Sequence, residues 1–344
     1  MLALMAAGGI AFIVAVFATP FVIGWLRHRE IGQHIREDGP GHHHAKAGTP
    51  TMGGLVILAA VAIGFLLAHL GTSVHLSRQG ILAVGAVLAF GLVGFLDDWL
   101  KIRNRRSLGL NKRAKLAGQL VAATAFALLA AKWAGAKTSL SFTRLDLPGW
   151  NLGLVAWVVV VVLIMIGSSN AVNLTDGLDG LASGSSSFCF AVLAVAGYWQ
   201  FRHVDIYHLS DALDLALVDI ALAGGCLGFL WWNAPPAKIY MGDTGSLAIG
   251  AGLAALCTLQ NLELLLPIIG GLFVAETLSV IVQVLSYRTT GRRVFKMAPV
   301  HHHFELLGWP ESTVIVRFWI LGAMCAAMGL GIFYGDFLRV APVV

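Results

Sequence analysis

Charged residues are scarce in this sequence. Asp, Glu, Lys and Arg make up 12% of its 344 residues, whereas soluble domains carry roughly a quarter. Long apolar runs take their place, and the mean hydropathy is +0.80. This composition excludes an ordinary water-soluble domain and indicates that the lipid bilayer is the solvent.

Cysteine is rare, and the charged segment that begins a signal peptide is missing. The four cysteines (Cys189, Cys226, Cys257 and Cys325) all stand in apolar runs. We therefore expect small buried hydrophobic side chains, not disulfides or metal ligands. No charge precedes the apolar stretch 2–26, as a signal peptide would require, so this stretch is expected to be the first span.

Ten stretches are long and apolar enough to predict membrane-spanning helices. They lie near residues 2–26, 53–70, 80–96, 116–131, 152–169, 181–199, 213–232, 245–259, 262–286 and 315–335. Pro267, Gly270 and Gly271 predict a break in the ninth. The predicted fold class is all-α, as one polytopic membrane domain over residues 1–344.

The distribution of Lys and Arg predicts the orientation. Of the 23, 17 lie in or beside the loops that follow odd-numbered spans, and six lie elsewhere. Basic loops stay in the cytoplasm, which places both termini outside. The predicted cytoplasmic loops are 27–52, 97–115, 170–180, 233–244 and 287–314. The net charge of +5 is then explained by topology, and no nucleic-acid partner is expected.

The predicted outer side carries scattered acids without a pattern. These are Asp146, Asp205, Asp211 and Asp214, and they are expected to form a solvated face. Residues 138–150 contain Pro148-Gly149, which predicts a small hairpin on this side.

Polar residues gather in five blocks on the inner side. The first joins Lys46 to the glycines at 48, 53 and 54, just before the second span. Glycines let a backbone approach a ligand closely, and a lysine supplies a point charge for phosphate. The alternative is a plain loop-to-helix junction with a threonine cap.

The second block is the adjacent pair Asp97-Asp98 at the end of the third span. Two neighbouring carboxylates at a membrane boundary are costly unless a cation or a base offsets them. They point about 100° apart on a helix, so they need not share a role. Lys101 can pair with Asp97 at a spacing of four, and the basic run behind it can bind lipid head groups or anchor the topology.

The third and fourth blocks combine carboxylates with amides and hydroxyls. Asn173, Asp176 and Asp179 recur every three residues in a loop without a basic residue, which suggests a metal or a hydrogen-bonded ligand. Asp243, flanked by glycines, opens the eighth span, a position suited to an anion and its Mg²⁺. Helix capping is the alternative for both.

The fifth block contains three consecutive histidines, 301–303, in the longest loop. Adjacent side chains converge poorly on one ion, and structural zinc sites need spacing and usually cysteine. A second histidine run lies at 42–44.

Together the five blocks resemble the polyprenyl-phosphate N-acetylhexosamine-1-phosphate transferase superfamily. The resemblance rests on GTPTMGG at 48–54, Asp97-Asp98, NLTDGLDGLA at 173–182, GDTGSL at 242–247 and PVHHHFE at 299–305, in that order. The run of three histidines is similar to the motif found in the branch that acts on a muramoyl-pentapeptide.

The resemblance implies a Mg²⁺-dependent homodimer in a bacterial cell membrane, with its active site facing the cytoplasm. It would transfer phospho-N-acetylmuramoyl-pentapeptide from UDP-N-acetylmuramoyl-pentapeptide to undecaprenyl phosphate. The products would be lipid I and UMP, in the first membrane step of peptidoglycan synthesis.

The resemblance also implies roles for individual residues. The catalytic group would be Asp97, Asp98, Asp243, His302 and His303, with Asp243 as the Mg²⁺ ligand, Asp98 as the base and the histidines on the diphosphate or sugar side. Lys101 and Lys115 would hold phosphates. Lys46, Asp179, Asn233 and Tyr240 would frame the uracil. Thr51, Asn173, Asp176 and Gly242 would line the neighbouring pocket, and Gln283 would face it.

Several alternatives stay open. The nearest is transfer of N-acetylglucosamine-1-phosphate within the same superfamily. A transporter would place acids near the bilayer midplane and often shows repeats, whereas these acids stand at helix ends. A metal exporter would need a histidine and acid cluster on both sides. The carrier phosphate can attack directly, or an aspartate can attack first. Glu276, well inside a span, has no predicted role.

Overall fold

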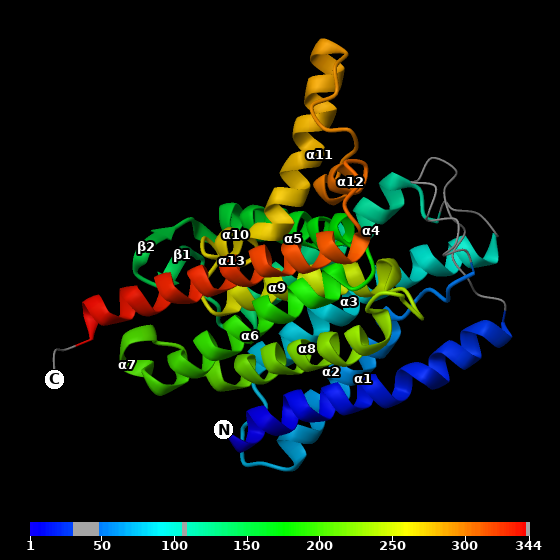
Figure 1. The fold of residues 1–344 in the computed structure, drawn as a ribbon. Helices are drawn as coiled ribbons and strands as arrows, with labels where there is room; N and C mark the ends of the chain where they lie inside the picture. The colour runs from blue at the N-terminus through cyan, green and yellow to red at the C-terminus, as the bar shows by residue number, and fades with distance from the viewer. Residues whose placement is uncertain (30–47, 105–108, 342–344) are drawn as a thin grey trace.

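The computed structural model describes residues 1–29, 48–104 and 109–341, and it is built almost entirely of helices (Figure 1). The long helices are α1 (Leu2–His28), α2 (Gly54–Leu70), α3 (Arg78–Arg103), α4 (Lys112–Lys132), α5 (Gly153–Thr175), α6 (Leu181–Arg202), α8 (Ala212–Asn233), α9 (Gly242–Leu259), α11 (Gly271–Thr290) and α13 (Glu311–Val340). The short elements are β1 (Ser139–Arg144), β2 (Leu147–Asn151), α7 (Val204–Tyr207), α10 (Leu266–Ile269) and α12 (Val300–Glu305).

Nine helices in the described chain are long and apolar enough to cross a membrane, and α2, with 17 residues, is a shorter apolar helix. The predicted all-α polytopic fold is confirmed. Helices satisfy their own backbone hydrogen bonds, which is why lipid-facing segments take this form. The four cysteines are free, as predicted.

Helix α9 lies at the centre of the bundle and packs against α3 and α5. Small residues allow this contact. A side chain at Gly250 would collide with the carbonyl of Ser168, and one at Gly94 would collide with the carbonyl of Asp243. Close approach through small residues is typical of helices packed in membranes. It fixes the start of α9 against the end of α3.

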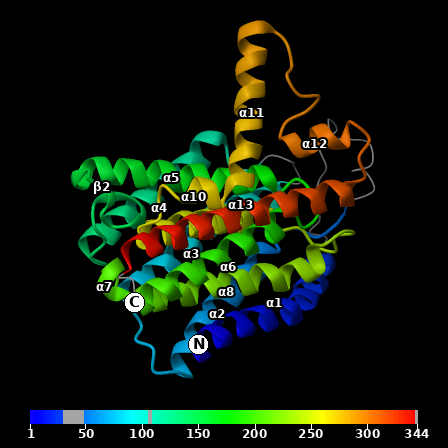
Figure 2. The same ribbon diagram turned by 60° about the vertical axis from the view of Figure 1, so that its left-hand side comes forward.

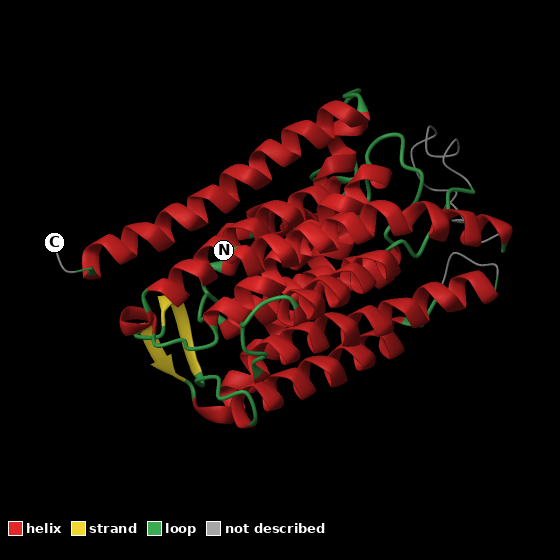
Figure 3. Ribbon diagram, turned by 90° about the horizontal axis from the view of Figure 1, so that it is seen from below, coloured by secondary structure: helices red, strands yellow, loops and turns green. Residues whose placement is uncertain are grey.

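The start of α1 and the end of α13 lie at the end of the bundle that carries the hairpin β1–β2 (Figures 1 and 3). The predicted hairpin is confirmed, with Ser139 opposite Asn151 in an antiparallel pair. Its register shifts between Trp150 and Pro148, where Gly149 has a φ of +68°, as glycines in β-bulges often do.

Asp214 corrects the expectation of a solvated acidic face. Its side chain is 3% exposed. One oxygen accepts hydrogen bonds from the backbone N–H of Ser77 at 2.8 Å and from its hydroxyl at 2.6 Å. The other oxygen lies 2.8 Å from Nε2 of His69. Asp214 therefore joins α2, α3 and α8, and this partner 137 residues away leaves no local trace in the sequence.

The break predicted in the ninth span is also confirmed. Helix α10 ends at Ile269, and α11 begins at Gly271. Figures 1 and 2 show α11 leaving the bundle at a steep angle, with α12 beside it. The projecting helix exposes large apolar side chains, among them Leu278, Ile281, Val282 and Leu285.

Candidate active site

Three carboxylates from two helices meet at one end of the bundle. Asp97 and Asp98 stand near the end of α3, and Asp243 stands in the first turn of α9. One oxygen of each lies within 4.8 Å of the others. Within the part of the chain that the structure describes, this is the one group of His, Cys, Asp and Glu side chains that could hold a metal ion. Its oxygens suit a hard divalent cation such as Mg²⁺.

Two lysines compensate this negative charge. Nζ of Lys101 lies 2.6 Å from Asp97, 2.7 Å from Asp243 and 3.4 Å from Asp98. Nζ of Lys115 lies 2.9 Å from Asp243. The predicted pairing of Lys101 with Asp97 is confirmed. The ammonium group of Lys101 occupies a position that favours a cation, which is a second indication that the carboxylates fit one.

Asp98 receives hydrogen bonds from the start of α9. Its Oδ2 accepts from the backbone N–H of Thr244 at 2.9 Å and from the Thr244 hydroxyl at 2.7 Å. Its Oδ1 accepts from the backbone N–H of Asp243 at 3.2 Å. Asp98 thus caps a neighbouring helix, whose first N–H groups have no partner within the helix. Asp97 instead accepts from the backbone N–H of Leu110 at 2.9 Å, so the two adjacent acids differ in role.

Gly242 is required by the geometry at this point. Its φ is +71°, a conformation that L side chains rarely adopt. A Cβ atom here would lie 2.5 Å from Oδ2 of Asp98 and 3.2 Å from Oγ1 of Thr51. The structure therefore brings the predicted pair Gly242 and Thr51 to the edge of the acidic cluster.

The first and fourth blocks are joined through their backbones. The N–H of Tyr240 donates to the carbonyl of Pro50 at 2.8 Å, and the N–H of Gly53 donates back to Tyr240 at 2.8 Å. The N–H of Gly54 donates to Met241 at 2.9 Å. The first block is therefore more than a loop-to-helix junction. Lys46, predicted in the same block, lies outside the described residues, as do the histidines at 42–44.

Asn173 binds the acidic cluster directly. Its Nδ2 donates to Oδ1 of Asp243 at 2.6 Å and to the hydroxyl of Ser246 at 2.8 Å. The amide at the end of α5 thus fixes one oxygen of Asp243, while Lys101 and Lys115 contact the other. Ser246 was not among the predicted site residues, although it belongs to the GDTGSL block.

Asp176 follows the last turn of α5 and lies in the same negative region. Burial, together with the charges of Asp243, Asp98 and Asp179, raises the pKa of this carboxyl from 3.8 to about 7. Burial is the largest cause, because a carboxylate loses hydration when it leaves water. A carboxyl perturbed in this way is typical of a functional site.

Asp179 and Asn233 hold one loop, at 234–241. Oδ2 of Asp179 accepts from the backbone N–H of Ala237 at 2.9 Å. Nδ2 of Asn233 donates to the carbonyl of Ile239 at 2.9 Å, and its Oδ1 accepts from the Ser183 hydroxyl at 3.0 Å. These two predicted nucleotide-binding side chains therefore shape the loop that carries Tyr240.

The three consecutive histidines have three different surroundings. His301 is buried, with Nδ1 3.1 Å from Oε1 of Glu276. Nδ1 of His302 lies 2.7 Å from Glu305. Nδ1 of His303 accepts from the backbone N–H of Lys296 at 3.0 Å. Their different partners agree with the expectation that adjacent histidines converge poorly on one ion.

Helix α12 packs directly on the loop at 176–180, which carries Asp176 and Asp179 and is called the acidic loop below. A side chain at Gly177 would collide with Nε2 of His301 and would lie 3.4 Å from Nε2 of His302. Gly177 follows Asp176 in the sequence, so the fifth block meets the third. The sequence did not single out His301 or Glu276 as functional, although His301 stands inside a predicted block.

Gln283 is hydrogen-bonded to the segment that follows α11. Its Oε1 accepts from the backbone N–H groups of Val294 and Phe295 at 3.0 and 2.9 Å, and its Nε2 donates to the carbonyl of Phe295 at 2.9 Å. Among the described residues, no hydrogen bond joins Gln283 to Asp97, Asp98 or Asp243.

Comparisons with known proteins agree with the site. Residues 80–261 match the model for glycosyl transferase family 4. Residues 46–58 match signature 1 of phospho-N-acetylmuramoyl-pentapeptide-transferase.

Curated relatives that align with this chain over almost their whole length carry the same name. The phospho-N-acetylmuramoyl-pentapeptide-transferase of Frankia alni is 49% identical, over 96% of this chain and 96% of the relative. That of Saccharopolyspora erythraea is 48% identical over 99% of both chains. That of Streptomyces avermitilis is 48% identical, over 95% of this chain and 96% of the relative.

Proposed function

This chain belongs to glycosyl transferase family 4, within the group of phospho-N-acetylmuramoyl-pentapeptide-transferases, and on this premise we propose how it acts. It transfers phospho-N-acetylmuramoyl-pentapeptide from UDP to undecaprenyl phosphate, and it releases lipid I and UMP. The observation that carries this proposal is the meeting of Asp97, Asp98 and Asp243 with Lys101 and Lys115. Two anionic substrates can approach each other only where positive charge offsets their repulsion.

The carboxylate cluster supports a Mg²⁺ requirement. Asp243 would be the main ligand, with Asp97 and Asp98 beside it. When bound, Mg²⁺ would neutralise the diphosphate and the leaving UMP. Lys101 and Lys115 would then exchange their carboxylate contacts for phosphate oxygens of the two substrates.

The transfer itself needs one bond made and one broken. An oxygen of the carrier phosphate attacks the phosphorus that bears the sugar, and the bond from that phosphorus to the UMP oxygen breaks. Direct attack is favoured because a phosphate monoester has a second pKa of about 6 and is mostly ionised at neutral pH. Little base is then required, and the hydrogen bonds of Asp98 to Thr244 and Asp243 favour a positioning role for it. The rival route, attack by an aspartate, would leave a phospho-sugar on the protein after a UMP burst.

The nucleotide would lie against the loop at 234–241. Asp179, Asn233 and Tyr240 are held in or beside this loop, and the Tyr240 ring would stack on the uracil. Asn173 and Asp176 would line the adjoining pocket. His302, which lies close to Gly177, would contact the diphosphate or sugar side, with His303 next to it.

The setting of the reaction is the bacterial cell membrane. The acidic cluster stands at helix ends next to the basic loops, which supports a cytoplasmic active site. The carrier tail must reach this site from the bilayer, and the exposed apolar side chains of α11 support a path along that helix. A homodimer is part of the proposal by analogy with the superfamily alone.

One experiment tests the reaction and the cluster together. Purified protein in detergent receives undecaprenyl phosphate, Mg²⁺ and either UDP-N-acetylmuramoyl-pentapeptide or UDP-N-acetylglucosamine, and UMP release is followed. We expect UMP from the pentapeptide substrate only, and none from Asp243→Ala. Asp146→Ala, on the hairpin, is the matched control because that carboxylate is exposed. UMP from the glucosamine substrate would assign the chain to that activity, and no UMP from either substrate with folded protein would refute the transferase.

A further inference from the structure

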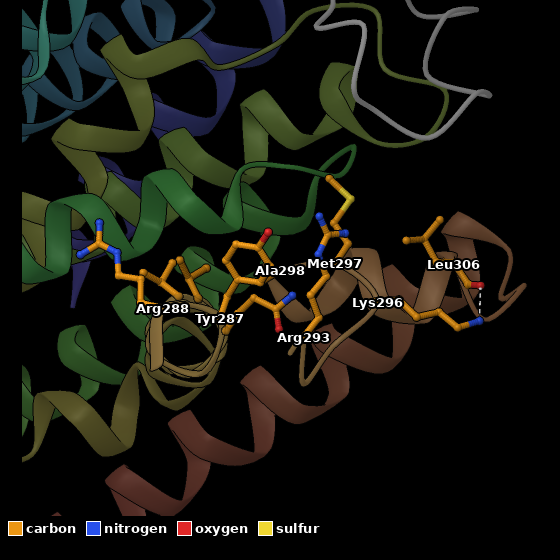
Figure 4. Close-up of a pocket in the computed structure, with 10 residues that line it drawn as sticks. Tyr287, Arg288, Arg293, Lys296, Met297, Ala298 and Leu306 are labelled. Carbon is orange, nitrogen blue, oxygen red and sulfur yellow. Dashed lines mark hydrogen bonds between the residues drawn. The ribbon is translucent and has the colours of Figure 1, made fainter. Parts of the chain in front are cut away.

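A cavity of about 630 Å³ lies beside the C-terminal half of α11 (Figure 4). Its other wall is the segment 293–298, with Leu306 beyond α12. The lining is apolar at Val280, Val284, Met297, Ala298 and Leu306, and it is polar at Gln283, Tyr287, Arg288, Arg293 and Lys296. Both walls thus combine apolar and polar side chains, and such a lining suits an amphiphilic ligand.

The polar part of the lining is cationic. None of the ion pairs between described residues includes Arg288, Arg293 or Lys296. Nζ of Lys296 donates to the carbonyl of Leu306 at 3.0 Å, which leaves its charge without a carboxylate. The amide of Gln283 is hydrogen-bonded to the backbone of Val294 and Phe295 on the opposite side. Arginine forks without a carboxylate partner favour a phosphate or a carboxylate ligand.

The position of the cavity favours a lipid as its ligand. Leu278, Ile281, Val282 and Leu285 are exposed along α11, which projects from the bundle (Figure 2), and an apolar surface of this kind suits acyl chains. Arg288 stands in the last turn of the same helix, so the cationic part of the lining lies where the apolar surface ends. A cationic surface at the end of an apolar one suits the head group of a phospholipid.

We propose that this cavity binds the head group of a net-anionic membrane phospholipid, at a site separate from that of the carrier lipid. The carrier phosphate has similar chemistry, but it must react at the acidic cluster. No hydrogen bond or ion pair in the described chain joins the lining of the cavity to Asp97, Asp98 or Asp243. A bound head group would contact the cations of the loop, Arg293 and Lys296, while Arg288 in the last turn of α11 adds positive charge at the other end of the lining (Figure 4).

Native mass spectrometry tests the proposal on the full chain without turnover. Protein in detergent is titrated with phosphatidylglycerol or with phosphatidylcholine of the same acyl chains. We expect one phosphatidylglycerol to be retained in preference to phosphatidylcholine. The double variant R288Q/R293Q should lose about 10-fold in apparent affinity for it. Both side chains are exposed, so the variant should keep its melting temperature.

The matched control is K132Q/K137Q, which removes two exposed positive charges at and just beyond the end of α4 and should retain the lipid. Equal retention of both lipids by the natural sequence, or full retention of phosphatidylglycerol by R288Q/R293Q, would overturn the proposal. Parallel loss of undecaprenyl phosphate would assign the cavity to the carrier. A raised KM for the pentapeptide substrate with unchanged lipid binding would assign it to the carboxylates of the peptide. Because the assay measures binding, failure of the proposed transferase reaction would not affect its outcome.

Discussion

Nδ1 of His301 lies 3.1 Å from Oε1 of Glu276, and both side chains are fully buried. The pair joins α11 to α12. On its other side, the imidazole occupies the space over Gly177 where no side chain fits. Glu276, which the sequence left without a role, therefore orients a histidine that in turn packs on the acidic loop.

Substitutions of Glu276 should show whether this residue positions His301 for nucleotide binding and turnover. Glu276→Ala leaves the buried imidazole of His301 without the carboxyl group that lies 3.1 Å from its Nδ1. Glu276→Gln keeps the size and one oxygen acceptor. We expect Glu276→Ala to raise the Kd for UMP and to lower kcat at least about 10-fold, a loss of about 1.4 kcal/mol, and Glu276→Gln to restore most of both. Calorimetric UMP titration and steady-state kinetics measure these effects. A melting temperature that falls while UMP affinity and kcat stay unchanged would show that the pair is structural only.

Gly242 should not tolerate any side chain. Gly242→Ala places a methyl group 2.5 Å from Oδ2 of Asp98 at a φ of +71°, which must displace either Asp98 or the start of α9. We expect kcat to fall at least about 100-fold, corresponding to roughly 2.7 kcal/mol. Gly291→Ala is the matched control, because Gly291 has a φ of +69° and open space around it. It should show only the backbone strain of about 1–2 kcal/mol, as a lower melting temperature with kcat kept. Equal loss of activity in both variants would refute the role of the clash.

The hydroxyl of Thr244 should matter through Asp98. Thr244→Val keeps the shape and removes the 2.7 Å hydrogen bond to Asp98, so the carboxylate should lose part of its fixed orientation. We expect a 10-fold to 100-fold fall in kcat, or roughly 1.4–2.7 kcal/mol, with little change in KM for the nucleotide. Thr258→Val, on the same helix, is the control because that hydroxyl donates to the carbonyl of Ala254 in its own helix. Similar kinetics for the two variants would count against a positioning role for Asp98.

The carboxyl of Asp176 should make stability depend on pH. Its pKa is raised from 3.8 to about 7 by burial and by nearby carboxylates. Between these two values the folded protein holds more protons than the unfolded chain, so stability falls as pH rises, and the full cost is present above pH 7. Asp176→Asn resembles the protonated acid and removes this cost.

Melting temperatures in detergent with EDTA test this sign. Asp176→Asn should melt about 3–6 °C above the natural sequence at pH 8, and the difference should shrink towards zero at pH 5. Asp146→Asn, on an exposed carboxylate, should show no such trend. A difference that is constant with pH, or that grows towards acid, would contradict the raised pKa of Asp176.

The features that the sequence predicts well are those set by local chemistry. Apolar length predicts the spans because only helices satisfy the backbone in lipid, and Pro267 with Gly270 and Gly271 marks the break before α11. The acidic cluster is predicted residue by residue only through the family resemblance. Its internal contacts, such as Asp98 to Thr244 across 146 residues, depend on how α3 packs on α9. The burial of Asp214 and the pairing of Glu276 with His301 likewise depend on how distant helices pack together.

The last prediction concerns Lys101, whose ammonium group stands among the three carboxylates that would hold the cation. Two roles then have opposite consequences. As a holder of phosphate, Lys101 is needed for turnover, so Lys101→Met should lower kcat/KM. As a positive charge 2.7 Å from Asp243, it repels a bound cation, so its removal should tighten cation binding by about 10-fold, or ~1.4 kcal/mol. Electron paramagnetic resonance of free Mn²⁺ measures that affinity without substrates. Lys132→Met, an exposed lysine at the far end of α4, is the control. Weaker Mn²⁺ binding in Lys101→Met would mean that the lysine preorganises the carboxylates rather than competing with the metal.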